Sequence, residues 1–335
     1  MSGGAIAYHL RENKAIERNL FIDLLARVGR VVNISDYTYT GFGGPFLEDF
    51  KALHAALRIE KMISIEMDKN VHERQKYNSP AKFIDLRKST CDEFLQNHEF
   101  TGGNIVWLDY TAPSELYQQL TEFRRLISKL GRLDIVKITL NANPQALGVS
   151  KDSEQSLHAH RRNELKKRLS DFDTFEITED DVLPKQYPTA LLKALISSVT
   201  GLASRSSAEF FQPLSSFVYK DGGHQMLTLT GIVLNAKDDT DKEKFLEKSR
   251  LDNWPFKNLN WKNPIEISVP ALSAKERLKL DEALPLNTTI NPGSELVKHL
   301  GYCPSESEKI EETTELLSHY AKYYRAYPLF SRVVL

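Results

Sequence analysis

The sequence of 335 residues lacks several features that would identify a class of protein directly. It has two cysteines, Cys91 and Cys303, too few for a disulfide framework or for a metal cluster built from cysteine. Its 44 Lys and Arg residues nearly balance its 45 Asp and Glu residues, so no overall field indicates nucleic acid or an anionic membrane as partner. No apolar run approaches the ~20 residues that a membrane span requires.

The composition that remains is that of an ordinary globular protein, with 41% hydrophobic and 27% charged residues. The first residues lack the basic stretch and apolar run of an export signal. With so few cysteines, these observations predict a cytoplasmic protein. The length exceeds the ~100 to 200 residues of a usual domain, which predicts one large domain with an elaboration.

Strand-like and helix-like segments alternate through the first 235 residues. An apolar stripe with helical period comes first, over residues 14–32. Five strand-like runs follow, at 36–40, 61–65, 82–86, 104–108 and 134–140. After helix-like segments at 153–169 and 189–203, two last strands, 214–219 and 225–234, flank a glycine-rich segment typical of a hairpin. This order predicts an α/β fold, a doubly wound seven-stranded sheet whose last pair of strands is antiparallel.

The same pattern predicts two domains. We expect residues 1–235, with the N-terminal helix, to form the ligand-binding domain. Residues 236–335 would be a mostly helical C-terminal extension, with helix-like segments at 274–284 and 306–324. The charged run 237–244 is interpreted as the linker between the two.

In a doubly wound sheet, ligands bind at the carboxyl ends of the strands near the point where strand order reverses. The first strand runs into residues 41–44, Gly-Phe-Gly-Gly, where glycine lets the backbone approach a ligand. Pro45 is expected to begin the next helix. Glu66 ends the second strand, where a carboxylate can accept the hydroxyl hydrogens of a ribose. A turn needed only for packing and a solvated strand end are the structural alternatives.

Phe46 disfavours a dinucleotide as the ligand. A dinucleotide-binding turn would have a third glycine three positions after the second, and Phe46 occupies that position. A dinucleotide-dependent oxidoreductase is therefore a weak alternative.

Asp109 and Tyr110 follow the most apolar strand of the sequence. An acid and a phenol at this strand end would border the reacting end of a cofactor that lies over the sheet edge. The structural alternative is that both side chains only form hydrogen bonds within the loop.

Three motifs at these strand ends carry a resemblance to a known superfamily. Residues 39–44, Tyr-Thr-Gly-Phe-Gly-Gly, residues 64–68, Ser-Ile-Glu-Met-Asp, and residues 106–111, Val-Trp-Leu-Asp-Tyr-Thr, resemble the cofactor motifs of class I methyltransferases. With the opening residues 8–18, the sequence resembles a bacterial family described as putative O-methyltransferases. The resemblance covers residues 8–235. It implies a Rossmann-like fold, S-adenosyl-L-methionine as cofactor, and O-methylation of a small-molecule or nucleotide-type acceptor.

The resemblance also implies roles for single residues. The turn after the first strand would contact the methionine part of the cofactor, Glu66 the ribose, and Thr90 with its neighbours the adenine edge. The implied cofactor residues are Thr40, Gly41, Phe42, Gly43, Gly44, Glu66, Thr90, Cys91 and Asp109. Asp109 is the first candidate for the catalytic base or positioning group, and Tyr110 the second.

Two departures from related families limit the chemistry. Residues 109–112 lack the paired prolines of enzymes that methylate amino groups of nucleic acids. Catechol-type O-methyltransferases hold magnesium with an acid after the fourth strand and an Asp-Asn pair after the fifth, where this sequence has Asp109 with Asn141 and Asn143. With one carboxylate where that family has two, magnesium is the less favoured alternative and no bound metal is expected.

Two groups of basic residues are weaker candidates. Tyr8, Arg11 and Lys14 share one helical face and could bind a carboxylate or phosphate of the substrate, although a solvated face is the more common explanation. The basic run between His158 and Arg168 is spread around its helix, which indicates solvation rather than a surface that binds nucleic acid.

A function of a different class stays open at this point. The chain could be a non-catalytic subunit or sensor that binds S-adenosylmethionine and acts through protein or nucleic-acid contacts. Binding of the cofactor without methyl transfer to any acceptor would favour that alternative.

Overall fold

The computed structural model describes residues 11–150, 155–200, 209–235, 239–286, 290–304 and 309–328. Its strands form an eight-stranded sheet in the order β3-β2-β1-β4-β5-β7-β6-β8. The strands are β1 (Thr38–Gly41), β2 (Lys61–Glu66), β3 (Ile84–Lys88), β4 (Asn104–Asp109), β5 (Ile135–Asn141), β6 (Glu209–Asp221), β7 (His224–Asn235) and β8 (Ile265–Ile267).

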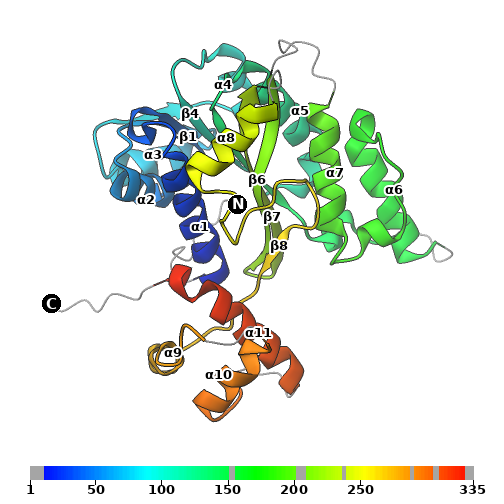
Figure 1. Cartoon of the computed structure of the whole chain (residues 1–335). Coiled ribbons are helices and arrows are strands. Elements are labelled where there is room, and N and C mark those ends of the chain that lie inside the picture. Colours follow the sequence, from blue (N-terminus) through cyan, green and yellow to red (C-terminus); the bar gives the residue numbers. More distant parts are fainter. Residues whose placement is uncertain are drawn as a thin grey trace. The chain divides into compact units, whose positions relative to one another are not determined.

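Helices alternate with the first strands and lie on both sides of the sheet (Figure 1). They are α1 (Glu12–Val28), α2 (Glu48–Leu57), α3 (Lys69–Asn78), α4 (Cys91–Asn97), α5 (Leu116–Lys129), α6 (Leu157–Leu169), α7 (Tyr187–Val199) and α8 (Asp239–Ser249), followed by α9 (Ala274–Asp281), α10 (Pro292–Leu300) and α11 (Ile310–Tyr323). None of these described helices combines the length and the apolar character that crossing a membrane requires.

The strand order confirms the predicted doubly wound sheet. Strands β3, β2, β1, β4 and β5 are parallel neighbours, and the order reverses between β1 and β4. β7 runs antiparallel to β5, with Ile135 opposite Ile232 and Asn141 opposite Met226. The short strand β8 is an addition to the seven strands that the sequence predicts.

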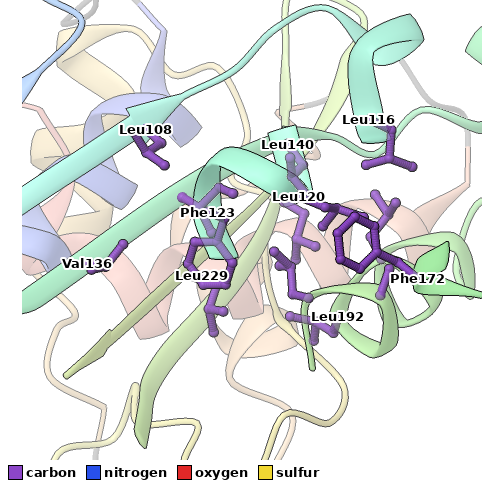
Figure 2. Packing of buried hydrophobic residues seen from close by; sticks show 14 of the residues in the cluster. Leu108, Leu116, Leu120, Phe123, Val136, Leu140, Phe172, Leu192 and Leu229 are labelled. Atoms are coloured by element: carbon purple, nitrogen blue, oxygen red, sulfur yellow. The ribbon is translucent and has the colours of Figure 1, made fainter. Parts of the chain in front are cut away.

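The central strand β4 shows why the sheet is covered on both faces. Val106 and Leu108 belong to a core cluster with residues of α5 and α7, and Figure 2 shows Leu108, Leu120 and Phe123 in it. Trp107 points to the other face, where its ring meets Phe21 of α1 edge-on at 5.4 Å. A strand buried on both faces needs the continuous apolar run that the sequence has at this position.

Two local predictions were wrong. α2 begins at Glu48 and not at Pro45, because Leu47 adopts a left-handed conformation with φ 52° and its amide bonds the carbonyl of Gly43 at 3.1 Å. The charged run 237–244 is not an extended linker, since α8 begins at Asp239. Lys and Glu are helix formers and Asp is favourable in a first helical turn, so a charged run can form a helix as well as a solvated linker.

The chain divides into two compact units. The first holds the described residues within 21–218 and 224–265, and the second holds those within 11–20, 219–223 and 266–328. In the second unit α10 packs closely on α11, since a side chain at Gly293 would meet the carbonyl of Thr314. These compact units are not the two domains predicted from the sequence, and the domain boundary after residue 235 stays a prediction.

Asp134 offers a test of how the starts of β4 and β5 are joined. Its carboxylate is 2% exposed and accepts the amides of Asn104 at 2.7 Å and of Gly131 at 2.8 Å. We expect Asp134→Ala to lower the free energy of unfolding by about 2–4 kcal/mol, because two amides lose a charged acceptor. Urea denaturation measures this loss. The exposed Asp85→Ala should cost less than about 1 kcal/mol, and an equal loss in both variants would contradict the assignment.

Candidate functional site

The strand ends that the sequence singled out meet at one edge of the sheet. Gly41 on β1 lies opposite Ser64 on β2 and opposite Trp107 on β4. Glu66 follows Ser64 by two residues, and Asp109 follows Trp107 by two residues. Both acids therefore lie just beyond the end of β1, on the same face of the sheet. The carboxyl edge at the point of strand reversal therefore carries the glycine turn with an acid on either side of it.

Two glycines of the glycine turn, residues 41–44, have a structural explanation that needs no ligand. A side chain at Gly43 would place its first carbon 2.3 Å from Leu47 Cδ2 and 2.6 Å from Ser64 Oγ. Gly44 has φ +52°, which favours glycine. Packing accounts for glycine at position 43 and backbone conformation for glycine at position 44, so ligand binding by the turn stays a prediction.

Glu66 is half-buried where β2 ends. Its Oε1 accepts the amide of Asp68 at 2.8 Å. Burial raises the pKa of Glu66 above its ordinary value, and the backbone amides beside it oppose that rise. A carboxylate has about four lone-pair sites, so the bond from Asp68 leaves acceptor capacity for a hydroxyl-bearing ligand.

Thr90 has a structural role that the sequence analysis did not assign. Its hydroxyl accepts the amide of Glu93 at 3.2 Å, and Glu93 in turn accepts the amide of Thr90 at 3.0 Å. This reciprocal cap begins α4. A contact from Thr90 to a ligand would have to add to this cap, and it stays a prediction.

Three predicted site residues, Phe42, Cys91 and Tyr110, come together near the ends of β1, β3 and β4. The ring of Tyr110 meets Phe42 edge-on at 5.5 Å, and its hydroxyl lies 3.4 Å from Cys91 Sγ. The same hydroxyl donates a hydrogen bond to Glu122 on α5. Burial, with Cys91 and Glu122 nearby, raises the pKa of Tyr110 well above its usual value.

The contact with Glu122 favours a positioning role for Tyr110. A phenol of raised pKa whose proton is held by a carboxylate is a poor proton donor or base at neutral pH. Glu122 was not predicted from the sequence, although one signal was present. Glu122 lies beside Phe123 on the buried side of α5, whose other members are apolar except for Gln119, and a buried acid needs a partner.

The amide oxygens of Asn141 and Asn143 are used within the loop that follows β5. Asn141 Oδ1 accepts the amide of Asn143 at 3.0 Å, and Asn143 Oδ1 accepts the amide of Gln145 at 3.1 Å. The described ranges contain no group of three or more His, Cys, Asp or Glu that could hold a metal ion. These two amides therefore give the magnesium alternative no support.

Arg168 corrects the prediction that the basic run is a solvated face. Its side chain is 15% exposed, and its guanidinium donates to the carbonyls of Pro113 and Ala146, both at 3.0 Å. Pro113 follows β4 and Ala146 follows β5, so one planar group joins the two loops that border Asp109. His158, Lys166 and Lys167 are exposed, as predicted. The difference arises because the face of α6 with Leu165 and Leu169 packs on the core.

The basic residues proposed for substrate binding belong to the second unit. Arg11 Nη1 lies 2.8 Å and Lys14 Nζ 3.0 Å from the carboxylate of Asp221, the last residue of β6 before the hairpin turn. Burial opposes ionisation of Asp221, but Lys14 and Arg11 outweigh it and lower its pKa. This ion pair is a structural account of both basic residues, and their substrate role stays a prediction. Tyr8 lies outside the described residues.

Comparison with known proteins identifies one family. Residues 6–335 match the family described as "Putative O-methyltransferase". No curated protein matches the sequence.

Several solved structures are similar at low identity. The plantazolicin methyltransferase BamL, solved with a desmethylPZN analog and SAH, is 13% identical, with 65% of this chain and 85% of that chain covered and a TM-score of 0.35. The O-methyltransferase TomG from Streptomyces achromogenes, solved with SAM, is 13% identical, with 64% and 79% covered and a TM-score of 0.33. A chain of a fibrillarin/Nop5p complex is 9% identical, with 59% and 72% covered and a TM-score of 0.33.

The Arg168 contacts predict that one substitution loosens two loops. Arg168→Ala should increase amide hydrogen exchange in residues 109–116 and 142–149 together. It should also lower the free energy of unfolding by about 2–3 kcal/mol, because two carbonyls lose charged donors. Mass-spectrometric hydrogen exchange measures the first effect and urea denaturation the second.

Lys167→Ala, on the exposed side of the same helix, is the matched control and should change neither quantity. Unchanged exchange in both loops of Arg168→Ala would show that the guanidinium does not hold them.

Proposed function

The chain belongs to the Putative O-methyltransferase family, and from this membership we propose that it transfers a methyl group from S-adenosylmethionine to an oxygen nucleophile. The observation that carries the proposal is the family match over residues 6–335. The carboxyl edge supports it, because a glycine turn, Glu66 and Asp109 meet there on adjacent parallel strands.

In the proposed complex the cofactor lies across this edge. The turn at residues 41–44 receives the methionine part, Glu66 accepts ribose hydroxyls, and the segment from Thr90 to Asp92 borders the adenine. Glu66 is suited to bind the ribose because its half-buried carboxylate is already oriented by the amide of Asp68. The acceptor is a hydroxyl of a small molecule or of a nucleotide-type compound.

Methyl transfer is a displacement at carbon in which the acceptor oxygen bonds to the methyl carbon as the sulfur leaves. Such a reaction depends chiefly on alignment, and it needs a base when the acceptor is an uncharged hydroxyl. Asp109 is proposed for that base, since it ends β4 half-buried at the edge where the methyl group would be presented. Tyr110, next to it, would hold the wall of the site through Glu122 and Cys91.

Replacement of Asp109 tests the assignment of the base. Asp109→Ala should reduce methyl transfer by about 100-fold or more, the usual contribution of a general base. Its affinity for S-adenosylhomocysteine should change little. Calorimetry measures the binding, and transfer of labelled methyl from S-adenosylmethionine to a panel of hydroxyl acceptors measures turnover.

Ser114→Ala, an exposed substitution in the same loop, is the control and should retain full activity. Undiminished transfer by Asp109→Ala would remove Asp109 from the mechanism. Cofactor binding by the native protein without transfer to any acceptor would favour a non-catalytic binding subunit.

Glu66 predicts a pH dependence of cofactor affinity. A ribose hydroxyl donates to the carboxylate form, so proton binding competes with the cofactor. Because the pKa of Glu66 is raised in the free protein, affinity should fall as the pH is lowered through that raised pKa, at a higher pH than for an exposed glutamate. Titration calorimetry across mildly acidic buffers measures the effect. Glu66→Gln should bind more weakly at neutral pH and lose this dependence, whereas an unaltered pH profile would argue against the ribose contact.

A further inference from the structure

Helix α3 contacts the last residue of the glycine turn and the two residues that follow it. Gln75 Nε2 donates to the carbonyl of Gly44 at 2.9 Å, and Asn78 Nδ2 donates to the carbonyl of Pro45 at 2.8 Å. The guanidinium of Arg74 lies over the ring of Phe46, 5.0 Å from its centroid. One face of α3 therefore holds this loop residue by residue.

Gln75 is the deepest of these contacts. Gln75 is fully buried. Its Oε1 accepts a hydrogen bond from the hydroxyl of Ser64 at 3.3 Å, while its Nε2 donates to the carbonyl of Gly44. The carbonyl of Gly44 can only accept, so the amide group of Gln75 has a single orientation that satisfies both of its ends. A buried amide satisfied at both ends is costly to displace, which makes it a rigid anchor.

Ser64 connects this anchor to the reason for glycine in the turn. Its hydroxyl oxygen lies 2.6 Å from where a side chain at Gly43 would begin. The turn thus packs directly on the hydroxyl that orients Gln75. Fixing the carbonyl of Gly44 on the next residue fixes the peptide plane that leaves the turn.

The other end of α3 is attached to Glu66. Asp68 caps the helix by accepting the amides of Asn70 at 2.8 Å and Val71 at 2.9 Å, and its own amide donates to Glu66 Oε1 at 2.8 Å. A ten-residue helix is a rod about 15 Å long. Its first residues therefore orient Glu66, and its last two turns hold the glycine turn.

We infer that Gln75 is a positioning residue that holds the turn at residues 41–44 in the shape that receives the amino-acid end of the cofactor, with α3 as the brace between that turn and Glu66. This inference rests on the proposed function. It predicts a loss of affinity that depends on which part of the cofactor a ligand carries, an effect that a general loss of stability would not produce.

The test compares two ligands on the native protein and three variants. S-adenosylhomocysteine carries the amino-acid end of the cofactor, and 5′-methylthioadenosine lacks it. Gln75→Met keeps the length of the side chain and removes both hydrogen bonds. We expect it to bind S-adenosylhomocysteine about 10-fold more weakly, the effect of roughly one lost hydrogen bond, and to bind 5′-methylthioadenosine with less than about twofold change.

Tyr77→Ala is the matched control, because Tyr77 lies on the same helix and is 92% exposed. It should bind both ligands as the native protein does. Gln75→Glu is a second variant, in which a carboxylate oxygen would face the carbonyl of Gly44, and it should lose at least as much affinity for S-adenosylhomocysteine as Gln75→Met. Melting temperatures, measured without ligand, show which of the variants are folded.

The outcomes separate the inference from the function on which it rests. If the native protein binds S-adenosylhomocysteine and folded Gln75→Met binds it equally well, the positioning role is wrong and the proposed function stands. Equal losses for both ligands would also overturn the inference, since they would indicate general disruption. If the native protein binds neither ligand, the proposed function fails, and the inference fails with it.

Discussion

The site depends on the register of one short strand. β1 has four residues and is hydrogen-bonded on both sides, to β2 and to β4. Its last residue, Gly41, is thereby fixed opposite Ser64 and Trp107, and the chain must leave the sheet as a turn at that point. Glu66 and Asp109 follow two residues later on the flanking strands. A slip of one residue in either pairing would turn the matching acid to the opposite face of the sheet.

The sequence was informative about this edge because each strand end is marked locally. An apolar run that stops at glycine or at an acid gives both the strand and its end, which is why Gly41, Glu66 and Asp109 were predicted at positions that the structure brings together. The wrong start of α2 has a local cause as well. Proline at residue 45 is compatible with a first helical turn. The left-handed conformation of Leu47 cannot be predicted from the sequence, and because of it the helix begins only at Glu48.

The polar residues that support the edge could not be predicted in the same way. Gln75, Glu122 and Arg168 lie on helices, and their partners are distant in sequence, at Gly44, Tyr110 and Pro113. Helical period shows which face of a helix is apolar, and a polar residue within that face signals only that a partner exists. The identity of the partner follows from tertiary packing. For the same reason Arg161 and Arg168 of the basic run proved to bind loop carbonyls, while His158, Lys166 and Lys167 are exposed.

These supporting contacts share a direction that bears on the chemistry of the edge. Side chains from outside the loops donate to loop carbonyls: Gln75 to Gly44, Asn78 to Pro45, Gln119 to Ala112, Arg168 to Pro113 and Ala146, Arg161 to Gly148, and Gln225 to Ala142. A carbonyl that is bound in this way has one of its two lone pairs occupied, and a ligand carboxylate at the edge then meets less repulsion from backbone oxygens. A displacement that depends on alignment gains from the same arrangement, because loops whose carbonyls are tied to helices need little reordering when the ligands bind.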